Sequence, residues 1–315
     1  LPPMIAGLVL AYRGKYLWGF ILTALFTAFE VKANHVQMTY YYLFVVLFMV
    51  IAYLVQAIKN KQLLHFGKAT AVCAAAACLG ICMNLSNLYH TWEYSKESMR
   101  GKSELVKANT ANQTNSGLER DYITQWSYGI GETWTLLIPN AKGGASVPLS
   151  QNETAMKKAD PNFIQIYQQI GQYWGEQPGT SGPVYVGAFV LMLFILALFI
   201  VKGPMKWALL AATVLSILLS WGKNFMPLTN FFIDYMPMYA KFRTVASILV
   251  IAEFTIPLLA MLGLKKILDT PSILNKQIKY VYISFGLTAG FCLLFALMPS
   301  VFFSNFVSAQ ELEAM

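Results

Sequence analysis

The sequence predicts an all-α polytopic membrane protein of about seven full transmembrane helices, with an insertion of mixed structure outside the membrane. Of its 315 residues 57% are apolar and 12% are charged. Soluble domains carry about 25% charged residues, twice this fraction. The apolar residues also come in runs that reach the ~18–20 residues needed to cross a bilayer. These observations exclude a soluble enzyme, a nucleic-acid-binding module and a disordered protein.

The first apolar stretch is too short to cross a bilayer. It runs from Met4 to Tyr12 and follows Leu1-Pro2-Pro3. This start has no initiator Met and lacks the basic region and the cleavage site of a signal peptide. We interpret the stretch as the truncated end of a first helix, and we expect the sequence to be an internal or C-terminal part of a longer protein.

Seven full-length apolar segments follow. They cover Tyr16–Val31, Met38–Ile58, Ala69–Leu88, Val184–Val201, Trp207–Trp221, Val245–Leu264 and Tyr280–Phe303. Residues 89–183 differ in composition, because Asn, Gln, Ser, Thr, Gly and Tyr are abundant there. We therefore expect transmembrane helices in residues 1–88 and 184–303, a loop domain at 89–183, and a C-terminal tail at 304–315.

Lysine and arginine in the short connections predict the orientation of these spans. If the spans alternate in direction, one side receives most of the cations and a single acid, Asp269. The cations are Arg13, Lys15, Lys59, Lys61, Lys68, Lys202, Lys206, Lys265, Lys266, Lys276 and Lys279. Short loops rich in Lys and Arg stay in the cytoplasm. Residues 89–183 are therefore expected to face outward, as are the loops around residues 32–37 and 223–243.

No cofactor or metal site is predicted. The four cysteines all lie in expected spans, at Cys73, Cys78, Cys82 and Cys292. Small residues such as cysteine inside a span more often allow close packing of helices than bind a metal. His90 and Glu93 are three residues apart, but no third ligand lies near them in the sequence. A divalent metal therefore has no support from the sequence.

Polar residues collect at the outer end of the first full span. If this segment is helical, Glu30, Asn34 and Gln37 form one stripe, with Lys32 and His35 on a neighbouring face. Ionisable residues inside a span usually face a cavity or a partner. The alternative is that Lys32 extends to the membrane interface and pairs with Glu30.

A second polar segment, at residues 222–244, is too short and too polar to span. We expect a re-entrant or interfacial loop beside a protein-lined cavity that also contains Asp234. Lys223, Lys241 and Arg243 place three cations where a lipid phosphate would lie. Arg can bind phosphate through two parallel hydrogen bonds, whereas Lys acts as a point charge. Contact with the bulk anionic headgroups is the alternative.

A third polar feature is Glu253, inside the span 245–264 and four residues before Pro257. A carboxylate in the outer half of a span is typical of a residue that lines a cavity. A neutral, hydrogen-bonded structural role would explain it equally well.

Several strings of the sequence resemble one family. They are Tyr12–Tyr16, Lys32–His35, Tyr173–Pro178 with Thr180–Gly187, Ser220–Phe225, Lys241–Arg243 and Ile251–Phe254. With these strings the chain resembles the YfhO family of bacterial membrane proteins over nearly its whole length, and the Bacteroidetes branch most of all.

The resemblance implies a fold similar to that of the GT-C glycosyltransferases, in the bacterial cytoplasmic membrane. Such enzymes transfer a sugar from a polyprenyl-phosphate donor to an acceptor, here an envelope glycan or lipid, on the outer face. It implies that Lys223, Lys241 and Arg243 bind the lipid phosphate, with Lys32 and His35 close by. It also implies an acidic catalytic base in an external loop that would precede Leu1.

Two other functions stay open. A transporter or flippase of a lipid-linked saccharide would also explain the acids inside the spans and the cationic loop. Transporters often have two halves with matching broken helices, and the sequence shows no such internal symmetry. A scaffold for envelope assembly is the third function.

Overall fold

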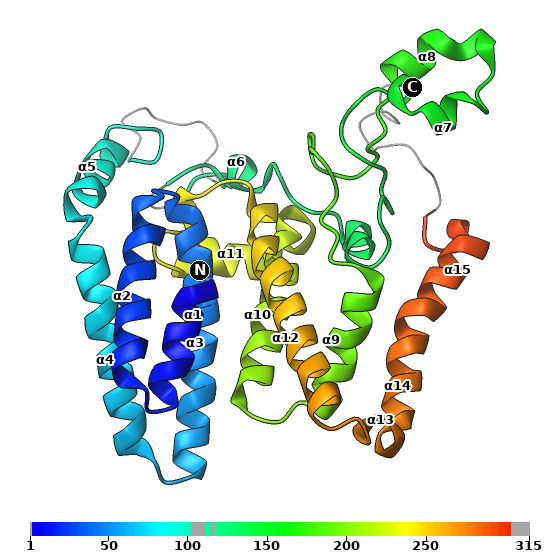
Figure 1. Ribbon diagram of the computed structural model, residues 1–315. Helices are drawn as coiled ribbons and strands as arrows, with labels where there is room; N and C mark the ends of the chain where they lie inside the picture. Colours follow the sequence, from blue (N-terminus) through cyan, green and yellow to red (C-terminus); the bar gives the residue numbers. More distant parts are fainter. Residues whose placement is uncertain (1, 102–110, 115–116, 304–315) are drawn as a thin grey trace. The chain divides into compact units, whose positions relative to one another are not determined.

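The computed structural model describes residues 2–101, 111–114 and 117–303 (Figure 1). Every regular element in this part of the chain is a helix, and the β-pairing there is confined to two isolated bridges. The predicted all-α class is therefore confirmed. The expected insertion contains short helices and irregular segments, without a strand among its described residues. The expected C-terminal tail at 304–315 lies outside the described residues.

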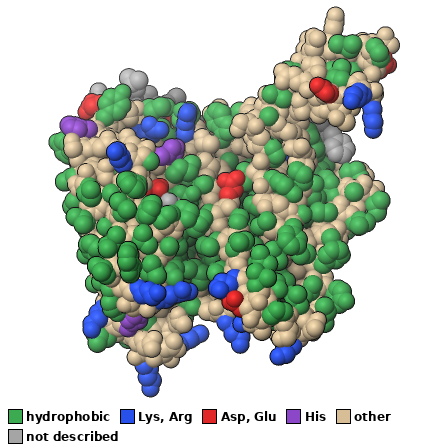
Figure 2. Space-filling model, in the orientation of Figure 1, with side chains coloured by type: hydrophobic (Ala, Val, Ile, Leu, Met, Phe, Trp, Pro, Cys, Tyr) green, Lys and Arg blue, Asp and Glu red, His purple; other side chains and the backbone are tan. Residues whose placement is uncertain are grey.

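Among the described residues, four helical segments are long and apolar enough to cross a membrane. They are α3 (Val36–Lys59), α4 (Leu63–Cys82), the segment Val245–Asp269 that contains α12 (Val250–Asp269), and the segment Ile278–Leu297. The last segment contains α14 (Ile278–Phe285), a π-helical turn (Gly286–Gly290) and α15 (Phe291–Leu297). Hydrophobic side chains cover the sides of the helices in Figure 2, and large apolar residues such as Leu17, Leu47 and Phe285 are exposed. Such faces suit contact with lipid.

The expected number of seven spans stays a prediction. A fifth candidate combines α10 (Pro204–Ser220) with the helical segment Gly222–Tyr235, which is bent from it by 108°. This segment contains a 3₁₀ turn (Gly222–Phe225) and α11 (Met226–Tyr235). Shorter apolar helices in the described part of the chain are α1 (Pro2–Tyr12) and α9 (Ala188–Ile200). Helix α2 (Tyr16–Lys32) has 17 residues and is not among the candidate spans.

The remaining helices are short. They are α5 (Leu85–Lys96), α6 (Arg120–Thr124), α7 (Glu153–Met156), α8 (Ile164–Gln169), α13 (Ile273–Lys276), and 3₁₀ turns at Ile130–Leu136, Leu149–Gln151, Pro161–Phe163, Tyr239–Lys241, Val245–Leu249 and Pro299–Val301. Short helices have few internal hydrogen bonds, so side-chain contacts with neighbouring loops must hold them in place.

The chain divides into two compact units. The first comprises Leu1–Arg120, Lys202–Leu215 and Ile233–Phe242, and the second comprises Asp121–Val201, Ser216–Phe232 and Arg243–Met315. The expected loop domain at 89–183 is therefore divided between them at Arg120. The residues just before Arg120 belong to the first unit in part because the backbone N–H of Leu118 donates to the carbonyl of Ala240, which lies in that unit.

Helices α1, α2 and α4 pack closely in the first unit. Ala11, Ala69 and Ala76 are fully buried there. A Cβ atom at Gly80 would lie 2.6 Å from the carbonyl oxygen of Ala24. Small residues let these helices approach, as is usual where there is no water to drive association.

In the second unit α9 packs against α12 and α14. The core of this packing is aliphatic, with Ala197, Ile256 and Leu259 almost fully buried. The loops of residues 121–187 belong to the same unit. The second unit therefore holds most of the expected insertion.

Candidate functional site

A cavity of about 510 Å³ lies in the first unit, and we call it the polar cavity. Three segments line it: the start of α3, the region of α5 with the residues that follow it, and residues 238–242. The lining residues are Asn34, His35, Val36, Gln37, Leu88, Thr91, Trp92, Tyr94, Ser95, Ser98, Arg100, Met238, Lys241 and Phe242. None of these described residues is acidic.

Cationic groups meet in the polar cavity. Arg100 Nε donates a hydrogen bond to the carbonyl oxygen of Lys241 at 3.0 Å, which brings the two residues together. No hydrogen bond or ion pair of the Lys241 ammonium group occurs within the described chain. A cation without a counter-charge in a cavity can bind an anion without first breaking an existing ion pair.

The N-terminus of α3 adds to this positive potential. His35 caps the helix, because its Nδ1 accepts a hydrogen bond from the backbone N–H of Met38 at 3.4 Å. In a neutral ring the other nitrogen, Nε2, then carries the proton and can donate. The first backbone N–H groups of a helix and its dipole favour an anion at this end. Together with Lys241 and Arg100, they make the polar cavity suited to a phosphate.

A second cavity, of about 340 Å³, lies among α1, α2, α3 and α4, and we call it the apolar cavity. Aliphatic side chains dominate its lining, which includes Leu8, Leu43 and Val46. Glu30 lines it as well and accepts a hydrogen bond from Thr39 Oγ1 at 3.3 Å.

The two cavities lie on either side of one corner of the chain. Residues 30, 31 and 39 line the apolar cavity, whereas residues 34–37 line the polar cavity. This corner differs from the single helical stripe expected for Glu30, Asn34 and Gln37. Helix α2 ends at Lys32, and Asn34 has φ +54°, which breaks the helix before α3 begins. Lys32 is exposed and lines neither of these two cavities.

The three cations expected to form one phosphate site belong to different units. Lys241 is in the first unit, and Lys223 and Arg243 are in the second. Lys223 has an exposed side chain, and its backbone N–H donates to Ser127 Oγ at 2.8 Å. Arg243 Nη1 donates to the Tyr122 hydroxyl at 2.6 Å. A joint site of all three cations stays a prediction.

The two remaining acids of the expected cavity lie elsewhere. Asp234, near the end of α11, forms an ion pair with Arg120, whose Nη2 lies 2.5 Å from its Oδ1. This pair joins two segments of the first unit. Glu253, on α12 in the second unit, is exposed. Neither acid lines the polar cavity.

The second unit contains a buried carboxylate whose role the sequence did not reveal. Glu132 is only 2% exposed. It accepts hydrogen bonds from the Gly129 N–H (2.6 Å), the Tyr173 hydroxyl (2.6 Å) and the Glu176 N–H (3.2 Å). Buried carboxylates are tolerated when donors satisfy them in this way. Glu132 therefore joins the loop at residues 127–132 to the loop at residues 173–176.

A third segment, Ser220–Phe225, is bound to the first of these loops. The Tyr128 N–H donates to the Ser220 carbonyl at 2.8 Å, and Trp221 Nε1 donates to Thr133 Oγ1 at 2.9 Å. We call residues 127–133, 173–176 and 220–225 the loop cluster. The sequence signal that could have identified Glu132 is its position three residues after Gly129, the N-cap of the turn. Its carboxylate accepts from the Gly129 N–H, which is one half of a capping box.

A small pocket of about 180 Å³ adjoins the loop cluster and is lined by Glu132, Lys142 and Tyr173, among others. Burial lowers the pKa of the Lys142 ammonium group, and the charges of Glu132 and Glu176 oppose this shift. The ammonium group lies over the rings of Trp174 and Phe303, at 4.5 and 4.2 Å. Such contacts stabilise a cation that has lost part of its hydration. Lys142 therefore serves the packing of this unit.

Replacing Gly222 with alanine should destabilise the loop cluster. Gly222 has φ +45°, and a Cβ atom there would overlap Ser127 Oγ and the Val245 side chain. We expect a loss of about 2 kcal/mol, the order of the strain of a left-handed non-glycine residue. Thermal unfolding of the purified protein, followed by tryptophan fluorescence, would measure it. Gly290→Ala is the control, because open space surrounds Gly290. Equal melting temperatures of the two variants would contradict the prediction.

No protein-family model matches the chain, and searches of curated proteins and of solved structures found no protein similar to it. The fold and the cavities alone therefore define its class. This class is a helical protein whose long apolar helices are suited to a membrane. Within the first unit it combines an apolar cavity with a cationic one.

Proposed function

We propose that the protein binds a polyprenyl-phosphate-linked sugar at the outer face of a bacterial cytoplasmic membrane and transfers the sugar to a glycan or lipid of the cell envelope. One observation carries the proposal: the polar and apolar cavities are lined by neighbouring residues on either side of the corner between α2 and α3. A lipid-linked donor has these same two parts, a phosphate and a long apolar chain.

Each part of the donor has a counterpart in the first unit. The phosphate would lie in the polar cavity, near Lys241, Arg100 and the N-terminus of α3. The isoprenoid chain would enter the apolar cavity. The sugar would contact Trp92 or Tyr94, since aromatic faces offer sugars an apolar surface beside a polar group.

In the proposed reaction the acceptor hydroxyl oxygen forms a bond to the anomeric carbon of the sugar. The bond from that carbon to the phosphate oxygen breaks, and its electron pair leaves with the lipid phosphate. A carboxylate takes the hydroxyl proton, and the cations stabilise the departing phosphate. No described lining residue of the polar cavity is acidic. We therefore propose that this cavity binds the phosphate and that the catalytic base lies outside its described lining.

The test is sugar transfer from a radiolabelled polyprenyl-phosphate donor by the full-length protein in membrane vesicles. The proposal predicts labelled acceptor that depends on the protein. Movement of the donor across the vesicle membrane without transfer would contradict a transferase and favour the transporter. Full transfer after removal of the charges of both Lys241 and Arg100 would contradict the site.

Arg243 is tested by a separate substitution. If it contacts the lipid phosphate, Arg243→Ala should lower transfer at least tenfold without loss of expression, because a charge-assisted hydrogen bond contributes about 1.5–3 kcal/mol. Tyr122→Phe is the control, since it removes the hydroxyl that Arg243 contacts and keeps the guanidinium charge. Unchanged turnover of Arg243→Ala would remove this residue from the site.

A further inference from the structure

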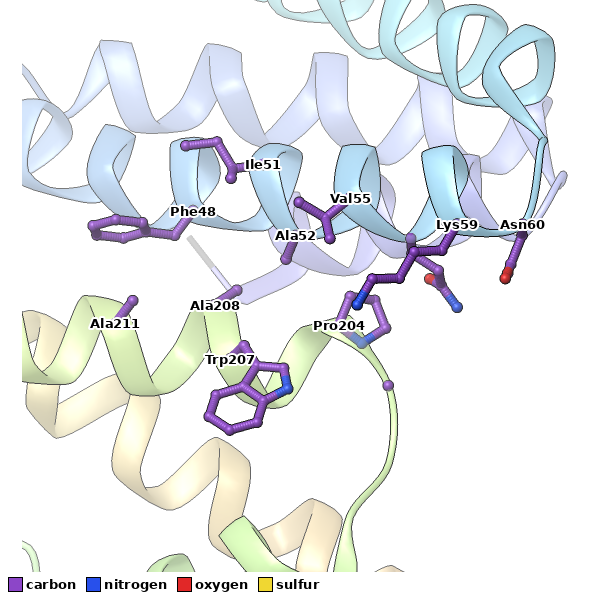
Figure 3. A pocket seen from close by; sticks show the side chains of 12 residues that line it. Phe48, Ile51, Ala52, Val55, Lys59, Asn60, Pro204, Trp207, Ala208 and Ala211 are labelled. Atoms are coloured by element: carbon purple, nitrogen blue, oxygen red, sulfur yellow. The ribbon is translucent and has the colours of Figure 1, made fainter.

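A groove of about 520 Å³ lies between α3 and α10 in the first unit (Figure 3). Its walls are apolar: Phe48, Ile51 and Val55 come from α3, and Trp207, Ala208 and Ala211 come from α10. The volume falls within the about 300–1,000 Å³ that is typical of small-ligand sites.

One end of the groove is polar and cationic. Lys59, at the end of α3, extends toward Pro204, at the start of α10 (Figure 3). No hydrogen bond or ion pair of the Lys59 ammonium group occurs in the part of the chain that the structure describes. Lys206 Nζ lies 4.9 Å from the centre of the Trp207 ring, so a second positive charge lies beside the groove.

The N-terminus of α10 lies at the same end. Pro204 is the first residue of this 17-residue helix, and its fixed φ suits that position. The positive end of the helix dipole therefore points to the place that Lys59 approaches. A positive end and apolar walls together complement a molecule with one anionic group and an apolar chain.

We propose that this groove binds an anionic phospholipid of the cytoplasmic leaflet, with its phosphate near Lys59 and one acyl chain along the apolar walls. Basic pockets between helices on the cytoplasmic side are typical sites for anionic headgroups, and the Lys and Arg distribution predicts that side for Lys59. The groove lies at the end of α3 opposite to the polar cavity, so this inference does not depend on the proposed transferase function.

The test measures lipid binding to the purified protein in detergent by native mass spectrometry. Phosphatidylglycerol and phosphatidylcholine with identical acyl chains are the two probes. We expect phosphatidylglycerol to bind several-fold more tightly. Lys59→Gln should weaken phosphatidylglycerol binding about fivefold, the effect of one lost cation at a membrane surface. It should weaken phosphatidylcholine binding less, because the choline cation offsets the charge of that lipid's phosphate. Lys68→Gln is the control, because Lys68 is exposed on α4 and does not line the groove.

A second variant tests the walls. Ala211→Phe places a ring in the groove and should reduce binding of both lipids while preserving the melting temperature within a few degrees. Equal binding of the two lipids, equal effects of Lys59→Gln and Lys68→Gln, or full lipid binding by Ala211→Phe would each overturn the proposal. A dimer that excludes lipid from the purified protein would also overturn it.

Discussion

Glu132→Ala is expected to open the loop cluster of the second unit. The substitution removes the acceptor of three donors, the Gly129 N–H, the Glu176 N–H and the Tyr173 hydroxyl. Each buried donor left without a partner costs about 1–3 kcal/mol, so the local opening free energy should fall by about 4 kcal/mol. Amide hydrogen exchange of the peptides that contain Gly129 and Glu176 would measure this loss, which corresponds to about a thousandfold faster exchange.

Two comparisons make this experiment specific. Glu176→Gln changes an exposed carboxylate of the same cluster and should alter exchange little, because exposed substitutions usually change stability by less than about 0.5 kcal/mol. Peptides from α3 belong to the first unit and should exchange as in the unaltered protein. Unchanged protection of the Gly129 peptide in Glu132→Ala would show that the carboxylate does not hold these loops.

The double variant Lys241→Gln/Arg100→Gln should have the largest effect on donor binding. Each charge-assisted hydrogen bond to phosphate contributes about 1.5–3 kcal/mol, so the loss of both should weaken binding at least a hundredfold. The matched control is Lys157→Gln/Lys158→Gln, which removes the same net charge from two exposed positions of the second unit. Equal affinities of the two double variants would show that total charge, and not the polar cavity, attracts the donor.

Composition predicted most of the helices because a bilayer imposes length and apolarity on every span. The span expected at Met38–Ile58 corresponds to α3, Val36–Lys59. Local backbone geometry was harder to predict from the sequence. The span expected from Val184 begins as a helix only at Ala188, after Gly187 with φ +99°.

The boundaries of α4 show how tertiary contacts move a helix. The expected segment was Ala69–Leu88, and the helix covers Leu63–Cys82. Its first turn includes His65, whose Nδ1 and Nε2 lie within hydrogen-bond distance of the Tyr16 hydroxyl and the Tyr12 carbonyl oxygen. Its end is followed by Asn84, whose amide donates to the Ala28 carbonyl. Polar residues that form hydrogen bonds with a neighbouring helix can extend a helix beyond its apolar run.

The sequence predicted some of the residues that line the polar cavity. Lys241 and His35 were expected near a phosphate and Asn34 was expected to line a cavity, and all three line the polar cavity. Arg100 was not expected, because it lies in the polar stretch and meets Lys241 only through a contact across 141 residues of sequence. Glu132 was missed for a similar reason: a single acid in a short 3₁₀ turn has no periodicity that would reveal its buried partners.

The most direct test of the proposed phosphate recognition compares polyprenyl phosphate with the uncharged polyprenol of the same chain length, each binding to the purified protein in nanodiscs. Both ligands have the same apolar chain, so their difference in affinity reports the cationic residues of the polar cavity. The proposal predicts that polyprenyl phosphate binds at least tenfold more tightly, and that Lys241→Gln/Arg100→Gln removes this difference while leaving polyprenol binding unchanged. Equal affinities for the two ligands in the unaltered protein would contradict it.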